Sequence, residues 1–408
     1  MTTTADPATR PLDEHLLEAT TGALELFGMY LGERLGLYRV LAGSAPLTSA
    51  ELADAAGIAP RYAREWLEQQ AVAGVLEADG TGPDDRRFRL PEAHVGILAD
   101  PTSVQHLAPF GRMLVGIAQV LDEVAAAYRT GGGVPYVRYG ADFRSGQGDI
   151  NRPTFSTALV DEWLPALAGG AVVERLASGG RVADLGCGQG WSSIAVARAF
   201  PQAEVWGIDG DVASVEDARE RAAAAGVTVR FEAVDAAELG GSGPFEAVLC
   251  LEMLHDVARP VEILAAARQA LAPGGAVLVA DEAVAPHFTA PGDQLERMMY
   301  GWSIVHCLPA SLVEQPSAAI GTVIREDVVR CLAAEAGFSS VEVLPIDGGF
   351  FRLYELRTSR GVGGLGPVAA PGGRHAHVSA PSRRWCREPC TAVRRRSAPW
   401  GGPRRRGR

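Results

Sequence analysis

The sequence contains no lysine, and all 38 of its basic residues are arginine. It also contains no run of about 18 apolar residues, which is the length that a membrane-spanning helix requires. The N-terminus, Met1 to Glu14, is polar and lacks the apolar stretch of a secretion signal. We therefore expect a cytoplasmic protein that has no membrane partner.

Cysteine is scarce, and its spacing is uninformative. The six cysteines form no CxxC pair, and their spacings do not match a zinc site. Unpaired cysteine is among the residue types that are most often buried. We therefore expect reduced, mostly buried thiols and no metal centre.

Negative charge exceeds positive charge over most of the chain. Residues 360–408 hold twelve arginines against one glutamate, a formal charge of +11, so the total of −11 leaves −22 on residues 1–359. An acidic body repels phosphates, which argues against a nucleic-acid partner. Residues 359–408 are rich in Gly, Pro, Arg and Ser without periodicity, so we expect a disordered tail. The alternative is a basic arm that binds anionic partners.

The length of 408 residues suggests two domains with extensions. Residues 1–11 are expected to be disordered. Apolar residues then recur at spacings of three and four over 12–42, which predicts a helix. This helix begins a region, 12–100, that is interpreted as a mainly helical winged-helix domain.

The winged-helix pattern follows that first helix. Ser49 is the predicted cap of a short helix over 50–56, and Gly57 makes the turn. A second helix is predicted over 61–72, and two short strands around a Gly/Asp/Pro turn between 75 and 90 form a wing. Helix, turn, helix and wing together are typical of this domain.

Residues 101–153 are interpreted as a connector that contributes to a cleft. Its first part, 103–129, has a helical pattern. The segment 130–153 is rich in glycine and aromatic residues and predicts a loop, which is long enough to suggest a function.

From Arg181 onward, predicted strands alternate with predicted helices, which is typical of βαβ units and a parallel sheet. The region 154–358 is therefore interpreted as an α/β domain. Its strands are expected at 181–185, 203–209, 227–233, 246–251 and 276–282. Its helices are expected at 191–199, 213–225, 260–271 and 325–336. An insertion, 287–320, interrupts the alternation, and a hairpin over 341–357 closes the domain.

A glycine loop follows the first of these strands. Gly186, Gly188 and Gly190 allow a close backbone approach to a ligand and positive φ angles. The third glycine comes one residue earlier than in the dinucleotide fingerprint G-x-G-x-x-G. Asp184 stands two residues before the loop, and its carboxylate suits a cationic ligand end better than a pyrophosphate. This pattern favours S-adenosylmethionine, which carries an ammonium and a sulfonium, over a nicotinamide dinucleotide.

Acidic residues end the next two strands. Asp209 can accept hydrogen bonds from both ribose hydroxyls. Asp235 can accept the adenine amino group, while the neighbouring N–H of Ala236 reaches a ring nitrogen. Solvated turn aspartates are the alternative. The predicted cofactor-binding residues are Asp184, Gly186, Cys187, Gly188, Gly190, Asp209, Gly210, Asp235, Ala236 and Glu252.

These motifs resemble the class I S-adenosylmethionine-dependent methyltransferases. The resemblance rests on the run from Asp184 to Gly190, on Asp209, on Val234-Asp235-Ala236, and on Leu271 to Gly275 before the fifth strand. The whole chain resembles the bacterial subgroup with an N-terminal winged helix. It implies a Rossmann-like seven-stranded sheet whose last strand is antiparallel. It also implies that the winged helix serves a homodimer or covers the substrate rather than reading DNA.

The segment 251–256 follows the fourth strand and lies beside the expected methyl donor. Glu252 or His255 is expected to contact the donor. His255 is alternatively the base that removes the acceptor's proton, because a histidine pKa lies near neutrality. A hydrogen bond that only orients the loop is the third interpretation.

Two segments are candidates for the walls of an acceptor site. The insertion contributes Met299, Trp302 and His306, the last also a tentative catalytic residue, and the segment 136–155 contributes Tyr139, Phe143, Asn151 and Arg152. Apolar and aromatic walls suit a small aromatic or polyketide-like acceptor. Ordinary packing is the alternative for both segments.

The predicted function is transfer of a methyl group to an O, N or C nucleophile of a small molecule by direct displacement. Such an enzyme mainly aligns the reacting atoms and excludes water. Three alternatives stay open: a winged-helix transcriptional regulator with a ligand-binding Rossmann domain, a nicotinamide oxidoreductase, and a methyltransferase fold that does not methylate.

Overall fold

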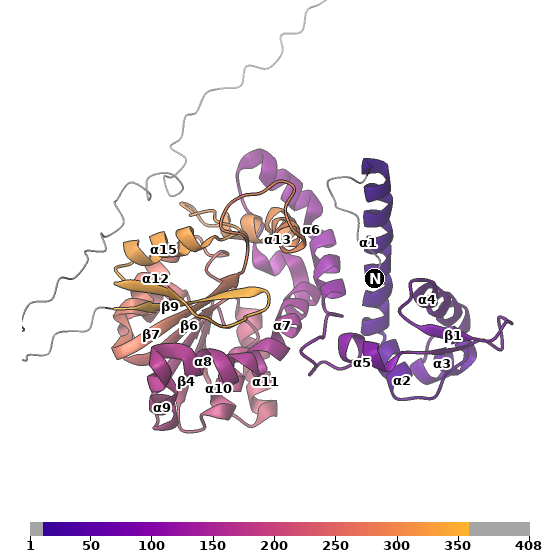
Figure 1. The fold of residues 1–408 in the computed structure, drawn as a ribbon, viewed down its shortest axis with the longest axis horizontal. Helices are drawn as coiled ribbons and strands as arrows, with labels where there is room; N and C mark the ends of the chain where they lie inside the picture. The colour runs from indigo at the N-terminus through magenta and orange to yellow at the C-terminus, as the bar shows by residue number, and fades with distance from the viewer. Residues whose placement is uncertain (1–10, 359–408) are drawn as a thin grey trace, which may run out of the picture.

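The computed structural model describes residues 11–358, with a helical N-terminal unit beside an α/β unit (Figure 1). The predictions for segments 1–10 and 359–408 lie outside the described residues. No helix within 11–358 is both long and apolar enough to cross a bilayer. Cys187, Cys250 and Cys307 are buried thiols, as predicted.

The first predicted helix is two helices, α1 (Leu12–Arg34) and α2 (Leu37–Ala42). The break occurs at Gly36, which has a φ of 71°. Side chains with a Cβ rarely adopt this backbone conformation, so glycine is the residue that allows the chain to turn here. The apolar periodicity continues across the break and therefore could not reveal it.

The winged-helix elements form as predicted: α3 (Ser49–Ala56), α4 (Pro60–Val72), and an antiparallel wing of β1 (Glu77–Asp79) and β2 (Arg87–Arg89). The cap of α3 lies one residue earlier than predicted. Thr48 accepts the backbone N–H of Glu51, and the Glu51 side chain accepts the backbone N–H of Thr48. This reciprocal pair is a capping box, which Ser49 does not form.

The winged-helix domain ends with α5 (Glu92–Leu98), and the connector contains α6 (Phe110–Thr130), a turn at Tyr136–Tyr139 and α7 (Gly140–Ser156). The predicted loop over 130–153 is therefore wrong from Gly140 onward. Its glycines serve packing: a Cβ on Gly146 would lie 3.0 Å from the carbonyl oxygen of Pro109, and one on Gly148 would lie 2.5 Å from Gln189 Oε1. Glycine is required here by close neighbours rather than by a turn.

Charged contacts tie α1 to the connector. Arg112 of α6 forms ion pairs with Glu33 of α1 at 2.8 Å and with Asp149 of α7 at 2.9 Å. The Tyr30 hydroxyl of α1 donates to Asp142 of α7 at 2.9 Å. These contacts hold the C-terminal half of α1 against α6 and α7.

The α/β unit contains a seven-stranded sheet in the order β5-β4-β3-β6-β7-β9-β8. Only β9 runs against its neighbours, which confirms the expected antiparallel last strand. The strands are β3 (Arg181–Leu185), β4 (Glu204–Asp209), β5 (Arg230–Ala233), β6 (Phe245–Leu251), β7 (Leu271–Glu282), β8 (Ser340–Val343) and β9 (Phe351–Arg357).

Helices cover the sheet (Figure 1). They are α8 (Leu164–Ala166), α9 (Ala171–Ala177), α10 (Trp191–Ala199), α11 (Val212–Ala225), α12 (Pro260–Gln269) and α15 (Glu326–Glu335). The strand order reverses at β3, because β4 and β5 lie on one side of it and β6 on the other. Open α/β sheets bind ligands at such a switch point, beyond the carboxyl ends of the strands.

The insertion folds as α13 (Gln294–Trp302), a wide turn at Ser303–Cys307 and α14 (Leu308–Ser311). It packs on the connector: the Trp302 and Phe110 rings stack with centroids 5.9 Å apart, and the Tyr139 hydroxyl donates to the carbonyl of Val305 at 3.0 Å. In Figure 1, α13 lies against α6 at one end of the sheet. The insertion and the connector together cover the carboxyl ends of the strands.

Candidate active site

Two neighbouring cavities lie between the strand ends and the layer formed by the insertion and the connector. The larger has a volume of about 640 Å³ and is lined by the glycine loop and by the ends of β4, β5 and β6. The smaller has a volume of about 100 Å³ and lies among α6, α7, α13 and the end of β7. Gln147, Asn151 and Glu252 line both cavities, so the two meet at these residues.

The glycine loop forms one wall of the larger cavity, where Gly186 and Gly188 have φ angles of 66° and 49°. Asp209 fixes this loop. Its Oδ2 accepts the N–H of Gly188 and its Oδ1 accepts the N–H of Asp211, both at 2.8 Å. Burial raises the pKa of Asp209. The structure therefore brings Asp209, Cys187 and Gly210 to the cavity beside the loop, as their positions in the sequence suggested.

Asp184 and Gly190 lie behind the loop and line neither cavity. The Asp184 carboxylate accepts the hydroxyls of Ser192 and Ser193 at 2.5 and 2.6 Å. Burial raises the pKa of Asp184 to about 6 although both hydroxyls lower it. Gly190 begins α10, and a Cβ there would lie 2.7 Å from the Phe231 ring. In this arrangement both residues shape the loop, and direct contact with a ligand stays a prediction.

Asp235 and Ala236 line the far end of the larger cavity. Asp235 Oδ1 accepts the N–H of Ala237 at 2.9 Å, and the other carboxylate oxygen pairs with Arg259. Arg259 also lies 3.7 Å from Glu314, which follows α14. The insertion therefore borders the end of the cavity at which we expect the adenine.

The connector supplies wall residues that the sequence analysis missed: Tyr136, Arg144 and Gln147 line the larger cavity. Gln189 of the glycine loop also lines it and donates to Asp217 at 2.6 Å. The apolar pattern could have revealed none of them, because these residues are polar or belong to a segment that was assigned to a loop. Once α7 is known to be a helix, Arg144, Gln147 and Asn151 fall on one face at spacings of three and four.

Glu252 stands where the cavities meet, with a φ of 54° that is uncommon for a residue with a side chain. The Asn151 amide donates to its carboxylate. Burial raises the pKa of Glu252 to about 7, while His255 and the Asn151 hydrogen bond lower it. The two predicted residues Asn151 and Glu252, 101 positions apart, thus form one contact at the junction.

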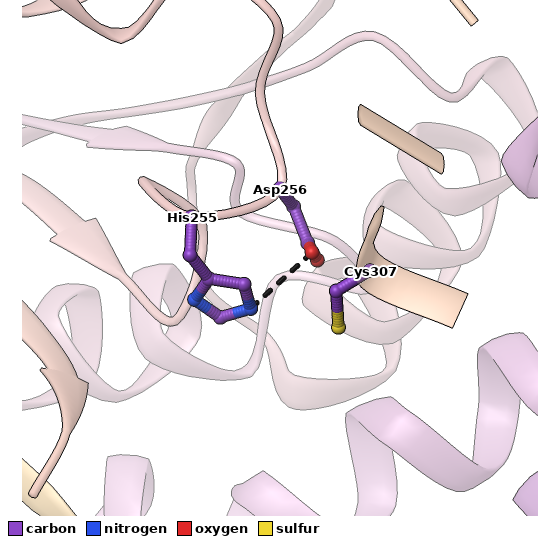
Figure 2. A group of neighbouring side chains, drawn as sticks. All are labelled: His255, Asp256 and Cys307. Atoms are coloured by element: carbon purple, nitrogen blue, oxygen red, sulfur yellow. Dashed lines mark ion pairs between the residues drawn. The ribbon is translucent and has the colours of Figure 1, made fainter. Parts of the chain in front are cut away.

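His255 is buried between two carboxylates. Its Nδ1 lies 2.5 Å from Asp281 Oδ1, and its Nε2 lies 3.2 Å from Asp256 Oδ1. Figure 2 shows the ring facing Asp256, with Cys307 of the insertion beside them. Burial disfavours the charged ring, but the two carboxylates prevail and raise the pKa of His255 well above its ordinary value. Burial raises the pKa of Asp256, but the attraction of His255 outweighs burial and lowers this pKa to about 2.

This cluster also contains side chains of the types that bind metal ions. Ligand atoms of His255, Asp256 and Cys307 lie within 4.8 Å of one another, as do those of His255, Asp281 and Glu282. Both ring nitrogens of His255 already face carboxylates, so a metal ion would have to displace a proton and one of these contacts. The arrangement is accounted for as a carboxylate–imidazolium–carboxylate chain.

The smaller cavity collects four of the predicted acceptor-site residues, Phe143, Asn151, Met299 and Trp302, together with His306. Tyr139 and Arg152 do not line it. Tyr139 is fully buried against His306, with ring centroids 4.5 Å apart, and the Arg152 guanidinium lies 4.2 Å from the Trp191 ring centroid. Their predicted contact with the acceptor stays untested, and the positions favour a supporting role.

Comparison with known proteins places both domains. Residues 176–321 match the family described as a methyltransferase domain, and residues 23–100 match the Rv2258c-like winged HTH domain. The ubiquinone biosynthesis O-methyltransferase of Bordetella avium is 38% identical over 116 residues, which are 28% of this chain and 45% of that protein. That of Caulobacter is 36% identical over 103 residues, or 24% of this chain and 40% of the relative. The chain thus spans less than half the length of these relatives.

Solved structures show the same fold over most of the chain. An O-methyltransferase family protein from Burkholderia thailandensis has a TM-score of 0.62 at 19% identity, covering 86% of this chain and 99% of that one. Human N-acetylserotonin methyltransferase in complex with SAM has a TM-score of 0.58 at 18% identity, covering 88% and 99%. The chain therefore contains a methyltransferase domain and an Rv2258c-like winged HTH domain, and it shares the fold of these solved methyltransferases.

Proposed function

We propose that this protein transfers a methyl group from S-adenosylmethionine to a hydroxyl oxygen of a small molecule. The observation that carries the proposal is the pair of adjoining cavities: a larger one on the glycine loop and a smaller apolar one beside it, meeting at Glu252 and Asn151. A donor in the first would face an acceptor in the second. The relatives that match part of the chain are named O-methyltransferases, which favours oxygen as the nucleophile.

The residues of the larger cavity fit this cofactor. Asp209 would hold the ribose hydroxyls, Asp235 and the N–H of Ala236 would hold the adenine, and the backbone of Gly186 to Gly188 would lie along the methionine part. The lining is acidic, with Asp209, Asp211, Asp235 and Glu252, which suits a ligand with two cationic groups. When bound, S-adenosylmethionine supplies an electrophilic methyl group on a sulfonium.

The chain's own part in the reaction is to align the acceptor, exclude water and take up a proton. We propose His255 as the base that takes the acceptor's hydroxyl proton. In the imidazolium form both ring nitrogens face carboxylates, so the ring must first lose the Nε2 proton and its contact with Asp256, while Asp281 holds Nδ1. These carboxylates make His255 a stronger base, and they also keep it protonated at neutral pH. Methyl transfer is therefore expected to accelerate at alkaline pH.

Calorimetry with S-adenosylhomocysteine tests the proposal without knowledge of the acceptor. The full chain is expected to bind it tightly and to show no response to NAD. Tight binding of NAD together with no response to S-adenosylhomocysteine would instead support a nicotinamide oxidoreductase. A methyltransferase fold that does not methylate would bind the cofactor and transfer no labelled methyl group to any acceptor.

A DNA-binding role is the second candidate for the winged helix, and the structure offers little for it. Five arginines of this domain lie next to acids of the same domain. The pairs are Arg61 with Glu65, Arg64 with Asp84, Arg86 with Glu68, Arg87 with Glu51, and Arg89 with Glu77. Phosphate contacts would require unpaired positive charge. These five arginines are thus compensated by acids of the same domain.

We further propose that the protein forms a homodimer through α1. Seven large apolar side chains of this helix and its end are exposed: Leu12, Leu16, Leu17, Leu24, Phe27, Leu31 and Leu35. A contiguous apolar stripe of this kind marks an interaction surface. A second copy of the chain offers the same stripe on its own α1, and a two-fold interface pairs identical surfaces in this way. A cytoplasmic location stays a prediction from the sequence.

A further inference from the structure

The smaller cavity has an unusual charge balance. Its titratable lining residues are Glu252, Glu282, His106, His255, His306 and Cys307. Among residues 11–358 no arginine lines it, and the chain contains no lysine. The groups that proteins ordinarily use to pair with a ligand's carboxylate or phosphate are therefore missing from this wall.

The histidines do not replace those cations. Burial lowers the pKa of His306 to about 4 and also lowers the pKa of His106, so both rings are neutral near pH 7. His255 carries a proton, but Asp256 and Asp281 already face its two nitrogens. Two carboxylates thus accompany the one imidazolium, and the region has a surplus of negative charge.

Glu252 and Glu282 respond to this surplus. Burial is the largest cause that raises the pKa of each, and neighbouring carboxylates raise it further. A site that disfavours the ionisation of its own carboxyl groups also disfavours an anionic ligand, because the same desolvation and the same repulsion act on both. A cationic ligand also loses its hydration on burial, but the carboxylates attract it instead of repelling it.

Two buried polar atoms in the wall still lack a partner. Within the part of the chain that the structure describes, Glu282 Oε2 and His306 Nε2 have no hydrogen-bond partner, and both residues are 2% exposed. Buried polar groups in proteins are nearly always hydrogen-bonded. A ligand in the cavity would meet both residues, whereas the remaining walls are mostly apolar: Leu107, Phe110, Met113, Phe143, Met299 and Trp302.

We propose that the smaller cavity selects the methyl acceptor by charge. It takes a single-ring acceptor that is uncharged or cationic and whose second polar group bonds to Glu282 and His306, and it rejects acceptors that carry a carboxylate or phosphate. The volume supports one ring, since about 100 Å³ is of the order of the roughly 150 Å³ cavity that holds benzene. This inference rests on the proposed function, because it assigns the smaller cavity to the acceptor.

Three ring compounds that differ in one substituent test the inference. Catechol is uncharged, dopamine is a cation and 3,4-dihydroxybenzoate is an anion. Binding of each is measured by calorimetry to the full chain saturated with S-adenosylhomocysteine. Catechol and dopamine are expected to bind at least about tenfold more tightly than 3,4-dihydroxybenzoate, because the carboxylate of the latter is repelled by the carboxylates around the cavity.

A variant of Glu282 tests whether this residue of the smaller cavity causes the selection by charge. Glu282→Gln keeps the size of the side chain and removes its acidic group. It is expected to lower dopamine affinity and to reduce the discrimination against 3,4-dihydroxybenzoate. Glu335→Gln, on the exposed side of α15, is the matched control and is expected to leave the order of the three probes unchanged.

The outcomes separate this inference from the proposed function. If S-adenosylhomocysteine does not bind, the proposed function fails first. If it binds, then equal or tighter binding of 3,4-dihydroxybenzoate would overturn the charge selection, and so would a failure of all three probes to bind. An unchanged ratio of dopamine affinity to 3,4-dihydroxybenzoate affinity in Glu282→Gln would show that this residue does not carry the selection.

Discussion

Asp209 combines two tasks in one side chain. Both of its oxygens already hold backbone N–H groups of the glycine loop and of the turn after β4, and the carboxylate still lines the larger cavity. Asp209→Asn replaces one acceptor by a donor and removes the charge. Hydrogen bonds to charged groups contribute about 1.5–3 kcal/mol, so the affinity for S-adenosylhomocysteine is expected to fall roughly 10- to 100-fold. Calorimetry measures this change.

Asp122→Asn is the matched control, because Asp122 is exposed on α6 and remote from both cavities. It is expected to bind S-adenosylhomocysteine like the unmodified protein. Unchanged affinity in Asp209→Asn would contradict the assignment of the larger cavity to the methyl donor.

His255 predicts a pH dependence of stability that needs no acceptor to be measured. Its pKa in the folded chain is raised above the unfolded value of about 6.5 by Asp256 and Asp281. The stabilisation is therefore fully present below about pH 6.5 and is lost as the pH rises through the folded pKa. The free energy of unfolding, measured by urea denaturation, is expected to decline over that alkaline range, and His255→Asn is expected to remove this decline.

The buried, neutral His306 does not contribute to the alkaline decline of the free energy of unfolding. Its pKa is lowered to about 4, so its effect on stability appears as the pH falls below about 6.5. His287→Asn, at an exposed position, provides the control. If His255→Asn keeps the same alkaline decline, then the two carboxylates do not hold a proton on His255.

At the scale of elements, α1 carries the prediction about assembly. Its C-terminal half is held by α6 and α7, whereas its large apolar side chains are exposed along the length of the helix. Leu24→Glu places a charge in the middle of this stripe and is expected to shift the protein from dimer to monomer in analytical ultracentrifugation. Burying an unpaired charge in an interface is strongly unfavourable.

Gly22→Glu is the control and is expected to stay dimeric: Gly22 lies two positions before Leu24, on a different side of the same helix, and an added Cβ there meets no atom within 4 Å. A protein that is monomeric before any substitution would refute an α1-mediated dimer. Dissociation by both variants would point to a general effect on the helix rather than to the stripe.

The elements also show where local pattern suffices and where it does not. The strands and helices of the α/β unit lie close to their predicted positions because buried strands and amphipathic helices have strong periodic signals. The helix α7 was missed because its glycines resemble a loop, although their role is close packing against Pro109 and Gln189. That requirement comes from other segments and is invisible in the local sequence.

At the scale of the whole molecule, charge predicts the behaviour toward nucleic acids. A chain that ends at Thr358 is acidic, and the arginines of its wing and second helix are paired with acids. It is expected not to retard duplex DNA in a gel-shift assay at moderate salt. Retardation would revive the transcriptional regulator, and retardation by the full chain alone would assign binding to residues 359–408.

The sequence by itself determined that the residues of the proposed donor site lie together. Each strand of a parallel sheet points its carboxyl end to the same edge, so Gly186, Asp209 and Asp235, which follow three successive strands, meet there without further information. Spacing along the chain was therefore enough to choose S-adenosylmethionine.

The proposed acceptor site was decided by the tertiary structure. Its wall is assembled from α6, α7, the segment after β6, the end of β7 and the insertion, which are far apart in the chain. The partnership of His255 with Asp281, 26 residues away, and the absence of any arginine from this wall exist only once these elements pack together. Long-range packing, rather than local periodicity, places these side chains, and it thereby sets which acceptor the protein can take.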